Sequence, residues 1–418
     1  MKNAHRINYL DLIYRITRGL MIKDGPPLKN VEILFFCHDD DRGEKLDGKH
    51  FATIADSFRK ECEFLGYSCA TIAHPWSKLS GKVTCGDAIT INRKFFKAGL
   101  KQKIYNFFGG RKIKKYLTGI YKTIVSNSGA NLVITIGCPE ALAIACRELG
   151  VAHAELLHAM GYATVEWNWE SKPKKCLPQF ILTFDQLSTK TFSRLSKQDV
   201  KVFQLPHPYI AKFINKNEGF PFPNEWEKKI TVDEKKKHIL VCLQWGYDGE
   251  LSQYKGLLEN GLYPKALETV FEDTSETIEW CMRAHPIHLK NLKYKHHLNL
   301  LKSLSYKFKN VSWEPWSMFS LPNILPHMSG CLSMSSFSAY DATQFGVTSV
   351  LMCPTLQKGN EAENWFSDLV LEDYVLKKNF DKEFIVNWSC TVEQKKSLIL
   401  SANNQTIIPV LLDKLLNK

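Results

Sequence analysis

The sequence lacks several features that would assign a chain to a simple class of protein. Its 418 residues contain no stretch of about 18 uncharged apolar residues, so no transmembrane helix is predicted. The first twenty residues mix charged and apolar positions and do not resemble a signal peptide, which favours a cytoplasmic protein. The twelve cysteines form no Cys-x-x-Cys pair, and several lie in apolar runs, so we expect buried thiols in a reducing compartment.

Familiar catalytic motifs are also missing. The chain has no P-loop, no Gly-x-Gly-x-x-Gly after its first apolar segment, no Gly-x-Ser-x-Gly elbow and no His-Glu-x-x-His motif. Asp39, Asp40 and Asp41 are consecutive, so their carboxylates cannot all point the same way, and a solvated loop is favoured over a metal site. We therefore expect neither dinucleotide oxidoreductase chemistry nor a bound metal.

Acidic residues are absent between Ala88 and Pro139, although the whole chain carries a net charge of only +12. Lysines and arginines alternate with aromatic residues in residues 93–116. This combination suits an anionic membrane surface or an anionic lipid-linked substrate, and the alternative is a solvated helix face with its aromatics in the core. No nucleic-acid-binding motif accompanies the segment, so no nucleic acid partner is expected.

Short apolar runs alternate with amphipathic stretches, and this pattern occurs twice along the chain. It predicts an α/β protein with two doubly wound domains, each built on a parallel sheet. We assign residues 1–205 to an N-terminal domain, 206–237 to a proline-rich linker, 238–395 to a C-terminal domain and 396–418 to a C-terminal helix, whose helical pattern begins near Val392. The predicted strands are 31–37, 68–72, 132–136, 152–157, 180–184, 200–204, 238–244, 278–284, 311–313, 330–333 and 349–352, and helices are expected at 47–65 and 140–149.

Ligands of open α/β sheets bind beyond the carboxyl ends of the strands, so polar residues that follow strands are the candidates. Arg283 and His285 follow one predicted strand and can donate to phosphate oxygens; the alternative is a structural histidine beside a turn proline. Ser335 and Ser336 follow another strand and precede a helix, where hydroxyls and amides either cap the helix or bind phosphate. Gly346 is the expected C-cap of that helix.

Three further loops carry candidate residues. Gln244 and Asp248 follow the strand that opens the second half, and Asp248 is either a nucleophile or general base or a simple turn residue. Glu155 and His158 lie at the end of a strand in the first half, where Glu155 is a candidate acid/base and His158 a substrate contact, unless both have hydrogen-bonding roles only. Glu140 opens the helix after residues 132–136.

In this order the motifs resemble those of bacterial GT-B glycosyltransferases of surface polysaccharide assembly. They are most similar to enzymes with cytidine-nucleotide donors, namely the retaining β-Kdo transferases and the sialyltransferases with His-Pro and Ser-Ser motifs. CDP-glycerol glycerophosphotransferases share a related pattern. The resemblance spans about residues 150–350 and rests on Glu155-x-x-His158-x-x-Gly161, Asp248-Gly249, Arg283-x-His285-Pro286 and Ser335-Ser336. The chain departs from it at Ala159, where many relatives have glycine, and in the helix after Ser336, where Asp341 is the nearest acidic residue.

The resemblance implies two Rossmann-like domains that face each other across a cleft. It implies transfer of Kdo, or a related acidic sugar such as sialic acid, from a CMP-activated donor to lipopolysaccharide O-antigen or capsule. Donors of the UDP-sugar, GDP-sugar or CDP-glycerol type, and a non-enzymatic protein that binds lipid-linked glycan, are the alternatives. No cofactor is expected, since a histidine, serines and helix amides can stabilise the single phosphate of a CMP leaving group.

The resemblance also implies roles for the candidate residues. Asp248 would be the catalytic carboxylate, and a nucleophile if configuration is retained. Glu155 would be the acid/base or an acceptor-side residue. The remaining candidates would bind the donor (Gln244, Arg283, His285, Ser335, Ser336) or the acceptor (Glu140, His158). The acceptor would be lipid-linked or an oligosaccharide, with residues 93–116 in peripheral contact with the inner membrane.

Overall fold

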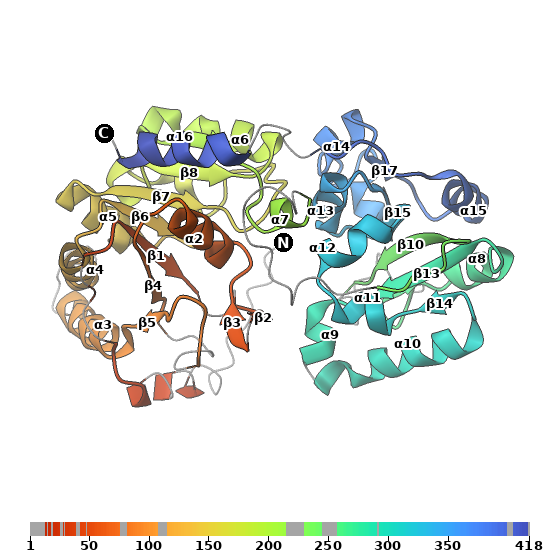
Figure 1. The fold of residues 1–418 in the computed structure, drawn as a ribbon, viewed down its shortest axis with the longest axis horizontal. Helices are drawn as coiled ribbons and strands as arrows, with labels where there is room; N and C mark the ends of the chain where they lie inside the picture. The colour runs from red at the N-terminus through yellow and green to blue at the C-terminus, as the bar shows by residue number, and fades with distance from the viewer. Residues whose placement is uncertain are drawn as a thin grey trace. The chain divides into compact units, whose positions relative to one another are not determined.

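The chain folds into two compact units, shown in Figure 1. The N-terminal unit contains Met1–Tyr209, Asn217–Phe220 and Ser401–Lys418, and the C-terminal unit contains Ile210–Lys216 and Pro221–Leu400. The structure is a computed structural model, and it describes residues 13–14, 16–17, 20–25, 28, 30–38, 42–46, 48–75, 82–107, 115–214, 230–244, 257–290, 292–398 and 404–416.

The N-terminal unit is built on a parallel sheet of seven strands in the order β5-β4-β1-β6-β7-β8-β9. The winding direction reverses between β1 and β6, which is the topological switch point of a doubly wound fold. The strands are β1 (Ile33–Cys37), β4 (Cys69–Ala73), β5 (Ile89–Thr90), β6 (Leu132–Thr135), β7 (Ala152–Leu156), β8 (Phe180–Thr183) and β9 (Lys201–Gln204), and a separate antiparallel hairpin contains β2 (Glu44–Leu46) and β3 (Lys49–Phe51).

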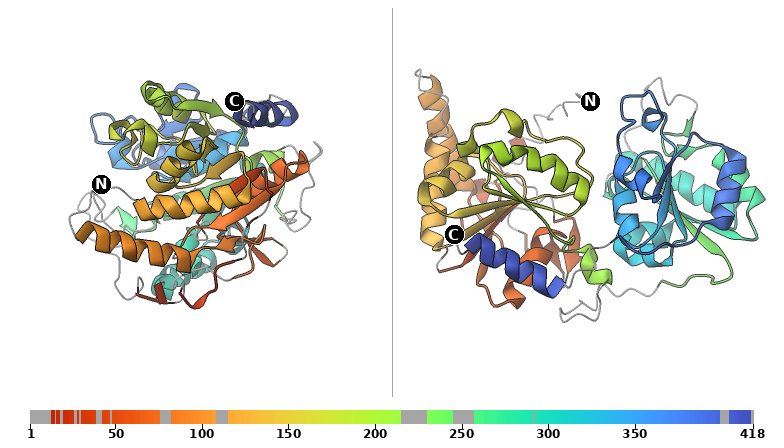
Figure 2. Two further views of the ribbon diagram at one scale, coloured as in Figure 1. Left: turned by 90° about the vertical axis from the view of Figure 1, so that its left-hand side faces the viewer. Right: turned by 90° about the horizontal axis from the view of Figure 1, so that it is seen from above.

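Helices cover both faces of this sheet. The central strands β1, β6, β7 and β8 are buried at every residue, so their alternating side chains meet a core on each face. Leu34 and Phe36 of β1 pack in one core cluster with residues of α4 and α5, whereas Phe35 contacts Phe58 of α2, with 6.4 Å between ring centroids. The helices of the unit are α2 (Ala55–Phe64), α3 (Asn92–Phe107), α4 (Lys115–Ser128), α5 (Glu140–Leu149), α6 (Gln186–Phe192) and α16 (Asn404–Leu416). Figure 2 shows α3 and α4 side by side.

The C-terminal unit has a parallel sheet of six strands in the order β14-β13-β10-β15-β16-β17, with the switch point between β10 and β15. The strands are β10 (Lys237–Cys242), β13 (Ile278–Arg283), β14 (Val311–Ser312), β15 (Gly330–Ser333), β16 (Thr348–Leu351) and β17 (Val375–Lys377), with a small hairpin of β11 (Leu258–Glu259) and β12 (Tyr263–Pro264). Its helices are α7 (Ile210–Ile214), α8 (Leu267–Asp273), α9 (Pro286–Lys290), α10 (Lys295–Lys307), α11 (Glu314–Met318), α12 (Leu321–Ile324), α13 (Ser338–Gln344), α14 (Ser367–Leu371) and α15 (Lys382–Thr391).

The prediction of two doubly wound α/β domains is confirmed, and every predicted strand is present within a residue or two of its expected bounds. The strands that the sequence did not predict are two or three residues long (β2, β3, β5, β11, β12 and β17), too short for a recognisable pattern. The predicted helix at 140–149 is α5.

Two helix predictions have the wrong start. The helix expected from residue 47 begins only at Ala55, since Gly48, with φ +71°, lies in the turn between β2 and β3. The C-terminal helix expected from about Val392 is α16, which begins at Asn404. Residues 392–398 are not helical, and in this segment Lys395 and Leu398 donate their backbone N–H groups to the carbonyls of Gly346 and Thr343.

Two sequence expectations concern the whole molecule. Among the described residues, no helix combines the length and the apolar character that crossing a membrane requires. All twelve cysteines are described, and none forms a disulfide bond; Cys390 is exposed, and eight of the others are buried.

Candidate functional site

The carboxyl ends of three neighbouring strands form one row in the C-terminal unit. Cys242 at the end of β10 pairs with Arg283 of β13 on one side and with Ser333 of β15 on the other. The sequence candidates Gln244, His285 and Ser335 each follow two residues beyond this row. Gln244 and Ser335 therefore flank the switch point between β10 and β15, where ligands of doubly wound sheets bind.

A hydrogen-bond network joins the loops after β10 and β15. The Gln244 amide donates to Ser333 Oγ over 2.9 Å and to the Cys242 carbonyl over 3.1 Å. Ser333 Oγ accepts from the backbone N–H of Ser336 at 3.3 Å. Gln244 is only 8% exposed, so this buried amide fixes the relative positions of the two loops.

The serine pair begins the turn into α13. Ser336 Oγ accepts the backbone N–H of Ser338, the first residue of α13, at 3.2 Å, and also contacts the Ser338 hydroxyl. The helix ends within a residue of the expected position: its C-cap is Phe345, and Gly346 follows with φ +76° and donates its N–H to the Thr343 carbonyl. Ser335 is half-buried beside this turn.

Arg283 and His285 point to different partners. The Arg283 guanidinium donates to the carbonyls of Trp316 and Phe319, so it braces the segment that contains α11 against β13. His285 is half-buried, and its Nδ1 accepts the backbone N–H of Ile287 at 3.3 Å. In the neutral ring this bond assigns the proton to Nε2, which makes Nε2 a hydrogen-bond donor.

The pKa of Asp341, in the C-terminal unit, is unusually high for a carboxyl group. It lies in the first turn of α13. Burial raises its pKa to about 7, although the positive charge of Arg283 acts in the opposite direction. Asp341 is the residue that the resemblance marks as the nearest acidic position after the serine pair. The other acidic candidate of this unit, Asp248, lies outside the described residues.

In the N-terminal unit, Glu155 on β7 is buried, with 1% of its surface exposed. Its carboxylate accepts hydrogen bonds from the Thr135 hydroxyl and from the backbone N–H groups of Gly137 and Cys138, the latter two at 2.6 and 3.1 Å. Glu155 thus holds the loop between β6 and α5 at the switch point of this sheet. Glu140, the first residue of α5, forms an ion pair with Lys172 at 3.1 Å.

The loop after β7 carries His158 on the surface. The Tyr162 hydroxyl lies 3.2 Å from His158 Nδ1 and 3.3 Å from Nε2. Gly161, with φ +81°, makes the turn between them, and its N–H donates to Asp185 at the start of α6. Because the loop is fastened to α6, His158 and Tyr162 are held in place.

Trp167 belongs to this surface and was missed by the sequence analysis. Its ring lies 6.1 Å from His158 and 5.9 Å from Tyr162, and the side chain is 38% exposed. Trp167 and Asn168 both have positive φ, 56° and 58°. Positive φ is energetically unfavourable for non-glycine residues, and such residues often lie in functional segments. Nothing in the sequence pattern indicates this conformation.

Two histidines follow the neighbouring strands β1 and β4, and they too were missed. His38 is exposed and its ring lies 4.4 Å from that of His74, which is 2% exposed. Burial, followed by the charge of His38, lowers the pKa of His74 to about 3, so its ring is neutral at physiological pH. Both residues come directly after strands, so the rule that identified His285 could have found them.

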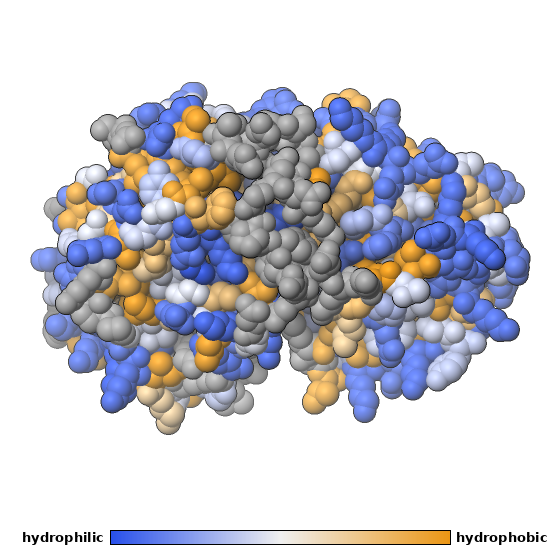
Figure 3. All heavy atoms as spheres, viewed as in Figure 1, coloured by the Kyte–Doolittle hydropathy of each residue, from blue (hydrophilic) through white to orange (hydrophobic). Residues whose placement is uncertain are grey.

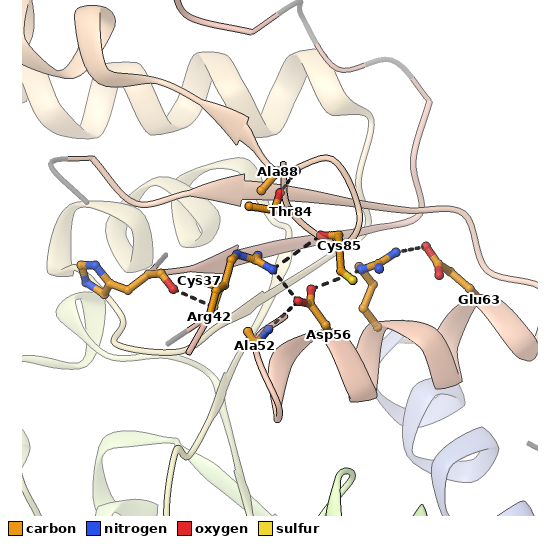
Figure 4. Close-up of polar contacts among 10 residues, drawn as sticks. Cys37, Arg42, Ala52, Asp56, Glu63, Thr84, Cys85 and Ala88 are labelled. Atoms are coloured by element: carbon orange, nitrogen blue, oxygen red, sulfur yellow. Dashed lines mark hydrogen bonds and ion pairs between the residues drawn. The ribbon is translucent and has the colours of Figure 1, made fainter. Parts of the chain in front are cut away.

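A buried ion pair joins Arg42 to Asp56 of α2, as Figure 4 shows. Arg42 and Asp56 are 0% and 1% exposed and form a direct pair, and Asp56 also accepts the Ala52 N–H at 2.7 Å. Arg59 Nε lies 3.7 Å from Asp56, and its guanidinium contacts Glu63. The three aspartates at 39–41 lie outside the described residues, and among the residues described no three His, Cys, Asp or Glu side chains are placed to hold a metal ion.

No protein-family model matches the chain, and no curated protein matches it in sequence. Solved structures do match it, and they show its fold. Among solved structures, UDP-GlcNAc 2-epimerase from Methanocaldococcus jannaschii has a TM-score of 0.55 at 11% identity, covering 91% of this chain and 99% of its own. UDP-GlcNAc 2-epimerase from Neisseria meningitidis, bound to UDP-GlcNAc, has a TM-score of 0.53 at 11% identity, with the same coverage of 91% and 99%.

MurG from Acinetobacter baumannii also matches, with a TM-score of 0.50 at 8% identity, covering 92% of this chain and 99% of its own. At such identities the likeness shows the fold alone. The matches cover nearly the whole chain, and both sheets have the doubly wound strand order. The chain therefore has the two-domain α/β architecture of the GT-B type that the motifs imply.

Proposed function

We propose that this protein is a glycosyltransferase that uses a nucleotide-sugar donor, with CMP-Kdo or a CMP-activated relative such as CMP-sialic acid as the donor. The observation that carries the proposal is the position of Gln244 and Ser335–Ser336 at a topological switch point, with His285 after the neighbouring strand at the same sheet edge. This is where doubly wound folds bind nucleotides. The acceptor in this proposal is a bacterial surface glycan of the lipopolysaccharide or capsule type.

The donor phosphate lies at this edge in the proposal. His285 donates from Nε2, because Nδ1 is already occupied by the Ile287 N–H. The Ser335 hydroxyl donates to the same phosphate, and so does the Ser336 hydroxyl once it turns from Ser338 Oγ, to which it donates in this structure. Arg283 keeps the neighbouring segment in position through Trp316 and Phe319. These donors stabilise the charge that develops on the CMP leaving group as the bond to the sugar breaks.

Asp248 supplies the catalytic carboxylate in this proposal. In a retaining reaction its oxygen attacks the anomeric carbon as CMP departs, and the acceptor hydroxyl then displaces the carboxylate. Asp248 follows Gln244 by four residues in the sequence. Its place in the order of motifs and the resemblance to β-Kdo transferases are the reasons to assign it this role.

Acceptor binding belongs to the N-terminal unit in the same proposal. The burial of Glu155 and its hydrogen bonds to Gly137 and Cys138 favour the acceptor-side alternative over direct acid/base catalysis. Glu155 then acts as a positioning residue for the loop that leads to Glu140. His158, with Tyr162 and Trp167, offers an exposed aromatic surface for a sugar ring.

The structural neighbours support a nucleotide-sugar ligand in general terms, since their names refer to UDP-GlcNAc. They do not favour cytidine over uridine. A UDP-sugar, GDP-sugar or CDP-glycerol donor therefore remains the alternative, as does a non-enzymatic protein that binds lipid-linked glycan. Residues 93–116 provide the peripheral contact with the cytoplasmic face of the inner membrane in each of these versions.

The test is thermal unfolding in the presence of CMP, CDP, UDP and GDP. Binding at a nucleotide concentration of about 100 times Kd stabilises the native state by about 2.7 kcal/mol, and CMP is expected to give the largest shift. His285→Ala should abolish the CMP shift, whereas His296→Ala, which changes an exposed histidine on α10, should retain it. Asp248→Asn should retain CMP binding and lose sugar transfer. If no nucleotide shifts the unfolding temperature, the proposal is wrong.

A further inference from the structure

A cavity of about 510 Å³ lies in the N-terminal unit, lined by α3, α4 and the edge of the sheet. Its volume falls within the range of about 300–1,000 Å³ that is typical of ligand pockets. The lining surface is mostly apolar and includes Ile72, Ile89, Ile91, Ile120 and Ile124. A sugar or nucleotide would leave many polar groups without hydrogen-bond partners there, whereas a hydrocarbon chain loses nothing.

Lysines line the same cavity. Lys94, Lys97 and Lys101 are spaced by three and four residues, which aligns them on one face of α3, and Lys115 is the first residue of α4. All four are exposed, and none has an ion-pair partner within the part of the chain that the structure describes. Among the described lining residues, none is acidic. A largely apolar interior, with lysines as the charged groups that the structure describes around it, fits a ligand with one hydrocarbon chain and an anionic head group.

A second row of side chains on α3 indicates where such a ligand comes from. Phe96, Leu100, Ile104 and Phe107 follow one another at helical spacing and are 37%, 51%, 50% and 85% exposed. Figure 3 shows orange apolar surface among blue hydrophilic surface on the left-hand side, where Figure 1 places α3 and α4. Exposed apolar residues beside lysines on one helix are typical of helices that lie in an anionic membrane surface.

We propose that the cavity between α3 and α4 receives one hydrocarbon chain of an anionic membrane lipid, with the lipid phosphate on Lys94, Lys97, Lys101 and Lys115. The inference deepens the membrane contact proposed for residues 93–116 and rests on that contact, but it does not depend on the transfer reaction. Burial of the lipid hydrocarbon chain would contribute to the free energy of membrane binding. Salt does not screen this contribution, whereas it does screen the attraction between the lysines and the phosphate.

The first test titrates the protein with monoalkyl phosphates of increasing length, from hexyl to dodecyl, below their micelle-forming concentrations. Burial of each methylene contributes about 0.8 kcal/mol, so affinity should rise about fourfold per methylene. One hydrocarbon chain enters the cavity in this proposal, so the stoichiometry should be one to one. Absence of saturable binding, or an affinity that does not rise with chain length, would overturn the proposal.

Two glycines provide a matched pair of variants. Gly119 on α4 is among the residues that line the cavity and Gly99 on α3 is not, and a Cβ atom at either position meets no atom of the described residues within 4 Å. Leucine raises helix propensity at both positions, so both variants are expected to fold. Gly119→Leu should fill the cavity and weaken octyl phosphate binding at least tenfold, whereas Gly99→Leu should bind like the unchanged protein. Equal affinities in the two variants would contradict the inference.

Vesicle sedimentation separates this inference from the contact on which it rests. The unchanged protein should bind phosphatidylglycerol vesicles and not phosphatidylcholine vesicles, and Gly119→Leu should lose binding at high salt while Gly99→Leu retains it. If both variants bind alike at all salt concentrations, residues 93–116 bind the membrane surface without a lipid chain in the cavity, and the inference is wrong. If the unchanged protein does not bind anionic vesicles, the proposed membrane contact is wrong. The proposed nucleotide binding does not depend on this result. A charge reversal, Lys97→Glu with Lys101→Glu, should reduce binding more than Lys103→Glu, because Lys103 does not line the cavity.

Discussion

Replacement of Asp56 by alanine should destabilise the N-terminal unit more than most single substitutions. Arg42 is fully buried, and the Asp56 carboxylate both neutralises it and accepts the Ala52 N–H at 2.7 Å. Removal of one partner of a buried pair costs about 3–5 kcal/mol, and a buried N–H that loses its acceptor adds about 1–3 kcal/mol. The expected loss is therefore about 4 kcal/mol or more, out of a typical stability of about 5–15 kcal/mol.

The assay is urea unfolding at neutral pH, supported by thermal unfolding. For a domain of this size, each kcal/mol corresponds to about 2–4 °C, so a fall of about 8–16 °C is expected. Two controls isolate the cause. Arg42→Met combined with Asp56→Leu removes both charges and should recover most of the stability. Glu148→Ala breaks the ion pair with Lys122, whose side chains are 39% and 49% exposed, and should cost under about 1 kcal/mol.

Two results would refute this reasoning. A loss below about 1 kcal/mol in Asp56→Ala would mean that the guanidinium of Arg42 finds water or another acceptor without cost. A double variant no more stable than Asp56→Ala would mean that the shape of these side chains matters more than their charge.

Two further predictions concern the C-terminal unit. Because burial raises the pKa of Asp341 from 3.8 to about 7, the folded state binds this proton more tightly than the unfolded chain, and stability should fall as the pH rises from about 4 to 7. Asp341→Asn should flatten that part of the curve of unfolding free energy against pH, and unchanged slopes would contradict the assignment. Gly346 has φ +76°, and a Cβ atom there would lie 2.0 Å from the Lys395 carbonyl oxygen. In urea unfolding, Gly346→Ala should therefore cost clearly more than Gly359→Ala, whose φ is +85° with nothing within 4 Å; similar costs would show that residues 392–398 move aside easily.

The sequence predicts the secondary structure best where the pattern is long enough to read. The apolar runs of the parallel strands are recognisable because both faces of the sheet are covered, and the end of α13 is recognisable because Gly346 adopts a positive φ. The hairpin of β2 and β3 was missed, since three-residue strands carry no periodicity, and a helix was predicted across β3 instead. The order of the predicted strands and helices along the chain therefore identified the two units and the loops that carry the candidate residues.

The local sequence pattern determined which residues follow which strands. Only the tertiary structure decided which strands are neighbours, and the row of Cys242, Arg283 and Ser333 is a consequence of that order. It also decided the environment of each side chain: Glu155 became a buried acceptor of backbone N–H groups, and α3 and α4 came to enclose a cavity. The physical reason is that hydrophobic periodicity acts over a few residues, whereas strand pairing and burial depend on residues far apart in the sequence.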